Sequence, residues 1–120
     1  MRARYAAFVA GDTATLLATW DPAMRPSPAQ LATPGPRWLC LNIEASETDG
    51  ACGWVRFRAL GRERGAFLEL VETSRFRFDD VARQWFYIDG DAEWQRLGVG
   101  RNAPCPCGSG LKAKRCCARD

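Results

Sequence analysis

Apolar residues near the start of the chain recur with the spacing of an α-helix. Tyr5, Phe8 and Val9 stand at positions i, i+3 and i+4, which predicts a short helix with one apolar face. Gly11 is typical of a helix end, and Asp12 or Thr13 would cap a second helix. The sequence therefore predicts two short helices within residues 1–20, with a buried face continued by Leu16, Leu17 and Trp20.

From residue 37 onward the apolar residues fall on alternate positions, as in a strand with one buried face. Four segments have this alternation or a high apolar content, and turn residues separate them: residues 37–45, 54–59, 66–78 and 84–89. Consecutive strands joined by short turns form an antiparallel meander, whose apolar face needs cover. The predicted class is α+β, with N-terminal helices packed on a four-stranded antiparallel sheet. The five tryptophans are expected mainly in its core.

The C-terminal segment is rich in cysteine. Cys105, Cys107, Cys116 and Cys117 follow the spacing C-x-C-x8-C-C, and four thiolates this close suit one tetrahedral zinc ion. A segment this short has no core of its own, so metal binding would supply its folding free energy, on the order of 10–16 kcal/mol. We therefore predict zinc as cofactor and three regions: an α+β domain at 1–92, a linker at 93–100 that separates the two cores, and a zinc knuckle at 101–120.

The two remaining cysteines, Cys40 and Cys52, are predicted to be free thiols. A hairpin turn at residues 47–50 would place Cys40 opposite residue 57 and Cys52 opposite residue 45. That offset is roughly 17 Å at ~3.3 Å per residue, which is beyond the reach of a disulfide.

Composition and charge narrow the possible functions. No apolar stretch is long enough to span a membrane and no signal peptide is evident, which favours a cytoplasmic protein with reduced thiols and no membrane partner. Residues 101–120 sum to +4 while the whole chain carries +3, so residues 1–100 sum to −1. Lys112, Lys114 and Arg115 are therefore candidate partner-binding residues. Alternatively, these cations offset the charge of about −2 on zinc bound to four thiolates.

Several segments together carry a resemblance to a known family: MRARYAAFV at 1–9, LLATWDP at 16–22, WL at 38–39, ETSRF at 72–76 and WFYIDG at 85–90. They resemble the middle domain of YchJ-like bacterial proteins, and residues 100–117 resemble the SEC-C motif that ends those proteins. The resemblance implies a nuclear-transport-factor-2-like cone, with helices in the mouth of a curved antiparallel sheet. The same zinc motif ends the preprotein translocase ATPase, where it docks an export chaperone and the ribosome. By analogy, this implies a protein-interaction role.

Related cone folds use a pocket, usually with an Asp–His pair, but this chain has no histidine. If one face of residues 66–78 looks into the cone, Glu72 stands among apolar neighbours and is a candidate general base. Alternatively, Glu72 pairs with Arg75 or Arg58, or points outward at a bulge. The possible pocket residues are Glu72, Arg75, Tyr87 and Asp89. No catalytic residue is assigned.

The leading hypothesis is a zinc-binding interaction module, with a protein partner in export, chaperone or ribosome-associated work. One alternative is a small-molecule enzyme or binding protein that uses the cone pocket without histidine. Another is nucleic-acid binding through the basic tail, which predicts a strong dependence on salt.

Overall fold

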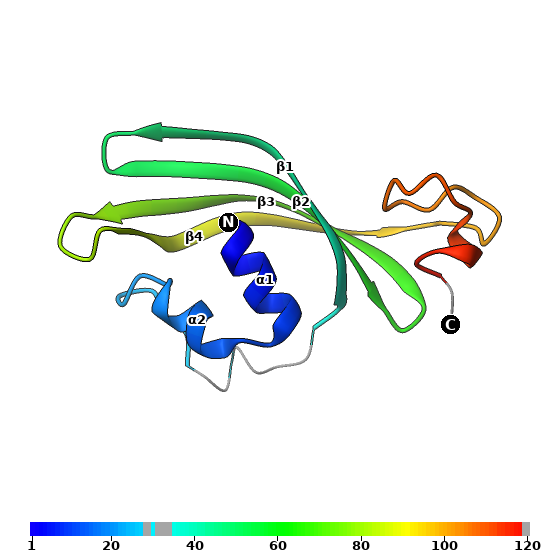
Figure 1. The fold of residues 1–120 in the computed structure, drawn as a ribbon, viewed down its shortest axis with the longest axis horizontal. Coiled ribbons are helices and arrows are strands. Elements are labelled where there is room, and N and C mark those ends of the chain that lie inside the picture. Colours follow the sequence, from blue (N-terminus) through cyan, green and yellow to red (C-terminus); the bar gives the residue numbers. More distant parts are fainter. Residues whose placement is uncertain (28–29, 31–34, 119–120) are drawn as a thin grey trace.

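The computed structural model describes residues 1–27, 30 and 35–118, and it begins with two short helices (Figure 1). Helix α1 (Arg2–Ala10) ends at Gly11, whose φ of 69° lies in the left-handed region that glycine adopts without a steric penalty. Helix α2 (Thr13–Ala18) is capped by Asp12, whose carboxylate accepts from the backbone N–H of Thr15 at 3.1 Å. The prediction of two N-terminal helices is confirmed.

Four strands follow, and each pairs antiparallel with the next, in the order β1-β2-β3-β4. They are β1 (Arg37–Asp49), β2 (Cys52–Glu63), β3 (Ala66–Asp79) and β4 (Gln84–Leu97). The predicted α+β class and its four-stranded antiparallel sheet are confirmed, but every strand is longer than predicted.

The end of β4 corrects the predicted linker. β4 continues to pair with β3 as far as Leu97, which lies opposite Phe67. Residues 93–97 are mostly polar and show no apolar alternation, so the sequence pattern did not mark them as strand. Backbone pairing with β3 determines their conformation, and only residues 98–100 of the predicted linker lie outside the strand.

Both helices lie against one face of the curved sheet (Figure 1). The buried centre of this layer is formed by sheet residues, and partly buried side chains surround it: Phe57, Ala59 and Leu70, with Met1, Tyr5, Trp38, Leu41 and Ile43 around them. Helix α1 turns Arg4 and Ala7 inward, each 4% exposed, whereas Phe8 and Val9 are 41% and 55% exposed. The predicted apolar stripe is therefore not the most buried face of α1, because the helix packs through Arg4 and Ala7.

The C-terminal segment packs on the opposite face of the sheet, near the end of β4 (Figure 1). Leu60 follows Ala59 in β2, so its side chain points away from the helices, and Phe67 of β3 lies on the same side as Leu60. Leu60 and Phe67 form one buried cluster with Cys105 and Ala113 of the C-terminal segment. The sheet and the C-terminal segment therefore share a core, which corrects the expectation of two separate cores.

The hairpin between β1 and β2 is tighter than predicted. Asp49 pairs with Cys52 across a two-residue turn in which Gly50 has a φ of 61°. This turn would place Cys40 opposite residue 61, and the register shift between Ile43 and Ala45 brings it opposite Leu60 rather than residue 57, so the predicted register is wrong. Cys40 and Cys52 are nevertheless both free, as predicted.

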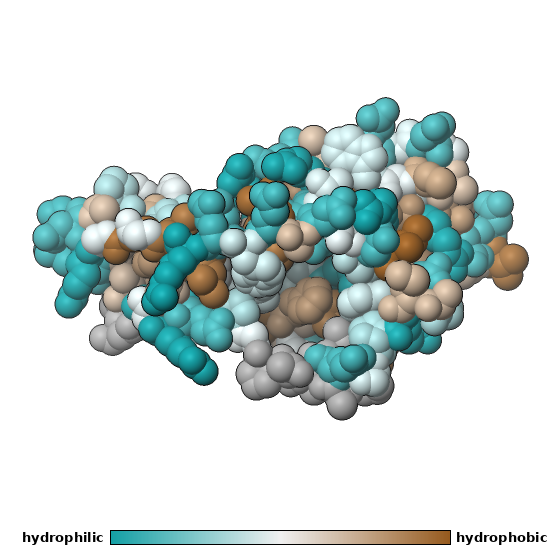
Figure 2. All heavy atoms as spheres, turned by 180° about the vertical axis from the view of Figure 1, so that it is seen from behind, coloured by the Kyte–Doolittle hydropathy of each residue, from teal (hydrophilic) through white to brown (hydrophobic). Residues whose placement is uncertain are grey.

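Hydrophilic side chains cover most of the surface seen from behind, and hydrophobic ones show only in small areas (Figure 2). Within the described part of the chain, no helix is long and apolar enough to cross a membrane.

Candidate functional site

The backbone of the C-terminal segment brings its two pairs of cysteines together. Pro104 and Lys112 form an isolated antiparallel bridge that closes the loop carrying the first pair. Within this loop Gly108 and Gly110 both have a φ of 83°, a conformation in which other side chains are strained. The short 3-10 helix η1 (Ala113–Arg115) then leads directly into the second pair.

The four sulfur atoms of Cys105, Cys107, Cys116 and Cys117 all lie within 4.8 Å of one another. The Sγ atom of Cys116 is 3.5 Å from that of Cys107 and 3.8 Å from that of Cys117. Four sulfurs bound tetrahedrally to zinc at about 2.3 Å lie about 3.8 Å apart. The donor set and its spacing therefore suit a four-coordinate metal ion, and the cluster could hold one.

The surroundings of the cluster influence the protonation of its thiols. A hydrogen bond from Ser109 lowers the pKa of the Cys107 thiol to about 6, whereas burial raises the pKa of the Cys117 thiol. The Ser109 hydroxyl also lies 3.2 Å from the Sγ atom of Cys116, as a donor. A bound divalent cation would favour thiolates throughout, because metal coordination deprotonates a thiol.

Cys40 lies beside this cluster but is not one of its four members. Burial raises the pKa of the Cys40 thiol, which favours the neutral form. Cys40 belongs to β1 and not to the C-terminal segment, so it lies near the candidate metal centre without being one of its four sulfur donors.

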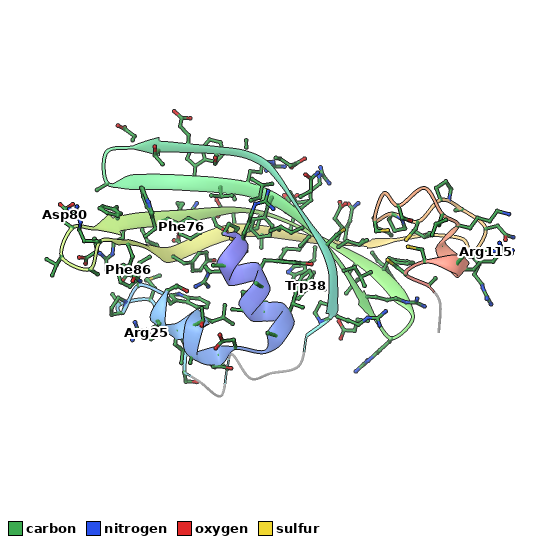
Figure 3. All side chains as sticks on the ribbon, in the orientation of Figure 1. Arg25, Trp38, Phe76, Asp80, Phe86 and Arg115 are labelled. Atoms are coloured by element: carbon green, nitrogen blue, oxygen red, sulfur yellow. The ribbon has the colours of Figure 1, made fainter. Side chains whose placement is uncertain are left out.

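The predicted partner-binding residues lie between the two pairs of cysteines along the chain. Lys112 and Arg115 are exposed, and Lys114 is partly exposed. Figure 3 shows Arg115 at one end of the molecule and Asp80 at the other. The structure extends 51 Å along its longest axis, so the C-terminal cations are separated from the acidic turn between β3 and β4.

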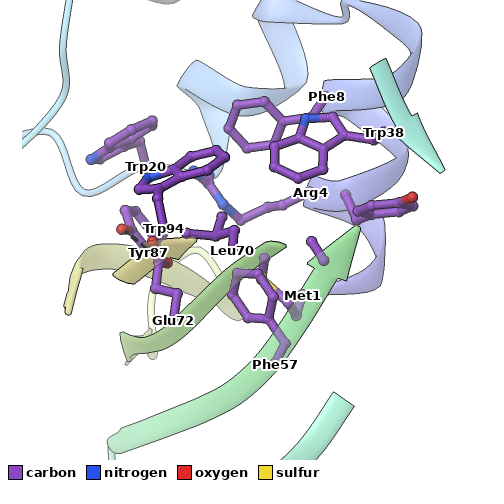
Figure 4. Close-up of a pocket in the computed structure, with 12 residues that line it drawn as sticks. Met1, Arg4, Phe8, Trp20, Trp38, Phe57, Leu70, Glu72, Tyr87 and Trp94 are labelled. Atoms are coloured by element: carbon purple, nitrogen blue, oxygen red, sulfur yellow. Dashed lines mark hydrogen bonds between the residues drawn. The ribbon is translucent and has the colours of Figure 1, made fainter. Parts of the chain in front are cut away.

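A second feature is a cavity of about 230 Å³ between α1 and the sheet (Figure 4). Its walls are largely aromatic and include Phe8, Trp20, Trp38, Phe57, Tyr87 and Trp94. The rings of Trp20 and Tyr87 meet edge to face, with centroids 5.0 Å apart. Three of the five tryptophans thus line a cavity, which corrects the expectation that they mainly fill the core. The two short helices do not fill the curve of the sheet, so these large rings border open space.

Of the four possible pocket residues, Glu72 and Tyr87 line the cavity, whereas Arg75 and Asp89 are not among its lining residues. Arg75 Nε lies 2.6 Å from Asp89 Oδ1, and the same guanidinium binds Asp91 at 2.8 Å. These residues form an ion-pair cluster with no part in the cavity.

A β-bulge explains why Tyr87 and Asp89 separate. Tyr87 pairs with Phe76 and Asp89 pairs with Arg75, so Ile88 is an extra residue in β4. The extra residue reverses the alternation, and Tyr87 and Asp89 therefore point to opposite faces of the sheet although they stand two residues apart.

Glu72 does not form the ion pairs that the sequence suggested for it. Its Oε2 atom accepts a hydrogen bond from the Ser74 hydroxyl and another, at 3.4 Å, from the Tyr87 hydroxyl. The carboxyl lies over Gly90, where a Cβ atom would come within 2.8 Å of its Cδ and Oε2 atoms. Burial raises the pKa of Tyr87 to about 12, so the phenol stays protonated and able to donate.

Arg4 is the charged cavity residue that the sequence analysis missed. Its Nη1 atom donates to the carbonyl oxygen of Leu16 at 3.2 Å and to Thr19 Oγ1 at 2.8 Å. The guanidinium carbon lies 4.8 Å from the Trp20 ring centroid and 4.4 Å from that of Tyr87. Burial lowers the pKa of Arg4 to about 10, which leaves it charged at neutral pH. The sequence signal that could have identified Arg4 is its spacing: it stands four residues before Phe8, which places both side chains on the same side of α1.

Comparison with known proteins supports two regions. Residues 1–90 match the family described as YchJ, middle NTF2-like domain, and residues 101–119 match the SEC-C motif. The UPF0225 protein SG1365 of Sodalis glossinidius is 40% identical over 127 residues, covering 98% of this chain and 77% of that protein.

Two solved structures have the same fold. A SEC-C motif containing protein from Rhodopseudomonas palustris, RPA3114, has a TM-score of 0.71 and 28% identity, covering 78% of this chain and 75% of that one. Another from Psychrobacter arcticus has a TM-score of 0.65 and 26% identity, covering 98% of this chain and 70% of that one. The chain therefore belongs to the YchJ-like family, in which an NTF2-like domain is combined with a SEC-C motif.

Proposed function

We propose that this chain is a zinc-binding protein-interaction module whose knuckle docks on an acidic partner surface. The observation that carries the proposal is the cluster of four sulfurs within 4.8 Å of one another at one end of the molecule. Four thiolates favour zinc or iron, and zinc adds rigidity without redox chemistry. A structural ion of this kind supports a recognition surface rather than a reaction.

The charge of the knuckle favours an acidic partner. Lys112 is the second residue of the bridge, and Lys114 and Arg115 lie between it and the last two cysteines, so a bound ion would hold their backbone in place. Cations on a rigid support accelerate encounter with an acidic surface, and the effect weakens as salt rises. By analogy with the SEC-C tail of the translocase ATPase, an export chaperone or a ribosomal component is the expected class of partner.

The metal is tested first, by elemental analysis of protein purified without chelators. We expect one zinc ion per chain and its loss in the Cys107→Ser variant, with Cys52→Ser as the matched control. Cys52 is an exposed thiol outside the cluster, so its replacement should leave the metal content unchanged. Iron in place of zinc, or full zinc in Cys107→Ser, would overturn the assignment.

Docking is tested by co-sedimentation with purified ribosomes and by binding to a purified export chaperone at increasing salt. The triple variant Lys112→Ala, Lys114→Ala, Arg115→Ala should keep its zinc and its fold but lose about tenfold or more in affinity. A control triple variant removes three exposed arginines elsewhere, namely Arg2, Arg25 and Arg83. Equal loss in both triple variants would indicate a general charge effect and contradict docking through the knuckle.

Nucleic-acid binding is the competing outcome of this experiment. If the triple variant loses affinity for naked RNA as strongly as for ribosomes, with a steep salt dependence, the tail binds phosphate and not an acidic protein surface.

A further inference from the structure

The cavity between α1 and the sheet has the size and the lining of a small-molecule site. Its volume of about 230 Å³ equals the liquid volume of about eight water molecules. Aromatic rings form most of its wall, and two opposite charges, Arg4 and Glu72, face the same space (Figure 4). A site with apolar walls and a few polar groups of this kind is typical of small-molecule binding.

Arg4 retains hydrogen-bonding capacity that the described residues do not use. Both of its hydrogen bonds come from Nη1, and within the described part of the chain Nε and Nη2 donate to no protein atom. Its side chain is 4% exposed, and no carboxylate of a described residue forms an ion pair with it. The Trp20 and Tyr87 rings stabilise the cation, and Glu72 attracts it electrostatically without forming a direct ion pair. The free edge of the guanidinium suits a carboxylate.

Glu72 also has one unused oxygen. The hydroxyls of Ser74 and Tyr87 both donate to Oε2, while Oε1 accepts from none of the residues that the structure describes. Because Gly90 has no side chain, the Glu72 carboxyl can lie directly over it, and the sheet therefore determines the position of this carboxyl. An ammonium group of a ligand would be the matching donor for Oε1.

We propose that this cavity binds a small zwitterion of the α-amino acid type with an apolar or aromatic side chain. The ligand carboxylate binds the Nε and Nη2 donors of Arg4, and its ammonium group donates to Glu72 Oε1. The apolar body packs among rings such as Trp38 and Trp94, whose centroids are 5.7 Å apart. A ligand with only one charge leaves either the free donors of Arg4 or the Oε1 atom of Glu72 without a hydrogen-bond partner, so the site discriminates against it. The proposal does not depend on the metal or on docking through the knuckle.

The test begins with the intact chain in a thermal-shift screen of the common amino acids at about 10 mM each. The best ligand is then compared by calorimetry with its analogues lacking the amine or the carboxylate. For L-phenylalanine these are 3-phenylpropionate and phenethylamine. We expect the zwitterion to bind about tenfold or more tightly than either analogue.

Two variants test the role of the carboxylate. Glu72→Gln should reduce the affinity for the amino acid about tenfold or more, yet leave binding of the amine-free analogue undiminished. Gly90→Ala should act in the same direction without removing the charge, because its methyl group displaces the Glu72 side chain. Glu69→Gln is the matched control, since Glu69 stands on the same strand but binds Arg58 outside the cavity.

Three results would overturn the proposal. One is the absence of stabilisation by any amino acid in the screen. The second is equal binding of a singly charged analogue, which would indicate a simple acid or amine site. The third is an affinity that Glu72→Gln and Glu69→Gln change alike. Circular dichroism of each variant ensures that a loss of binding is not a loss of fold.

Discussion

Removing the metal should destabilise the sheet as well as the knuckle. Leu60 and Phe67 of the sheet are 6% and 4% exposed, and the C-terminal segment forms part of their cover through Cys105 and Ala113. A knuckle without metal has too little core to stay folded. Its unfolding would expose these two sheet residues to water.

The size of the effect follows from the burial of these two side chains. Full burial of a Leu or Phe side chain stabilises by about 1.5–3 kcal/mol, and strands β1 and β4 still cover part of each after the knuckle unfolds. We therefore expect a loss of roughly 2–4 kcal/mol in the free energy of unfolding of the sheet domain. For a chain of this size, that corresponds to a fall of about 10 °C in the unfolding temperature.

Tryptophan fluorescence is the suitable assay. All five tryptophans lie between residues 20 and 94, so their signal reports the sheet domain alone. Thermal unfolding is followed with and without a chelator in the wild-type chain, in Cys107→Ser and in the control Cys52→Ser. The chelator should lower the midpoint in the wild-type chain and in Cys52→Ser, and should have no further effect on Cys107→Ser. An unchanged tryptophan midpoint after metal removal would refute the shared core and restore the independent domains that the sequence suggested.

Three further predictions concern single sites. Tyr87 should ionise near pH 12 in an ultraviolet titration, and Tyr87→Phe should remove this ionisation step. The contribution of Tyr87 to the free energy of unfolding is present below its ordinary pKa near 10 and is lost as the pH rises through about 12. Gly11→Ala should lower the free energy of unfolding by about 1 kcal/mol in urea, because φ is 69° there, and Gly11→Asn should cost less. In metal-loaded protein an alkylating reagent should label exposed Cys52 before half-buried Cys40, as mass mapping would show; equal rates would contradict the packing of Cys40 against the knuckle.

The cavity shows the limit of sequence reasoning most clearly. Alternation along residues 66–78 allowed Glu72 to face the cone but left an outward position or an ion pair with Arg75 or Arg58 open, and the structure places Glu72 in the cavity wall. The same reasoning could not separate Tyr87 from Asp89, because the bulge at Ile88 depends on how β4 pairs with β3. It also assigned Arg4 no role, since a charged residue on a short helix is normally exposed.

The sequence by itself determined the features that depend on residues close together in the chain. The spacing of Cys105, Cys107, Cys116 and Cys117 brings them within reach of one ion, and Gly11 and Asp12 define where the two helices meet. The tertiary structure decided the strand register, the extension of β4 and the packing of the knuckle on the sheet. The physical reason is the range of the interactions. Metal-ligand spacing and helix caps involve residues close in sequence, whereas register, bulges and buried charges depend on contacts between residues far apart in the chain.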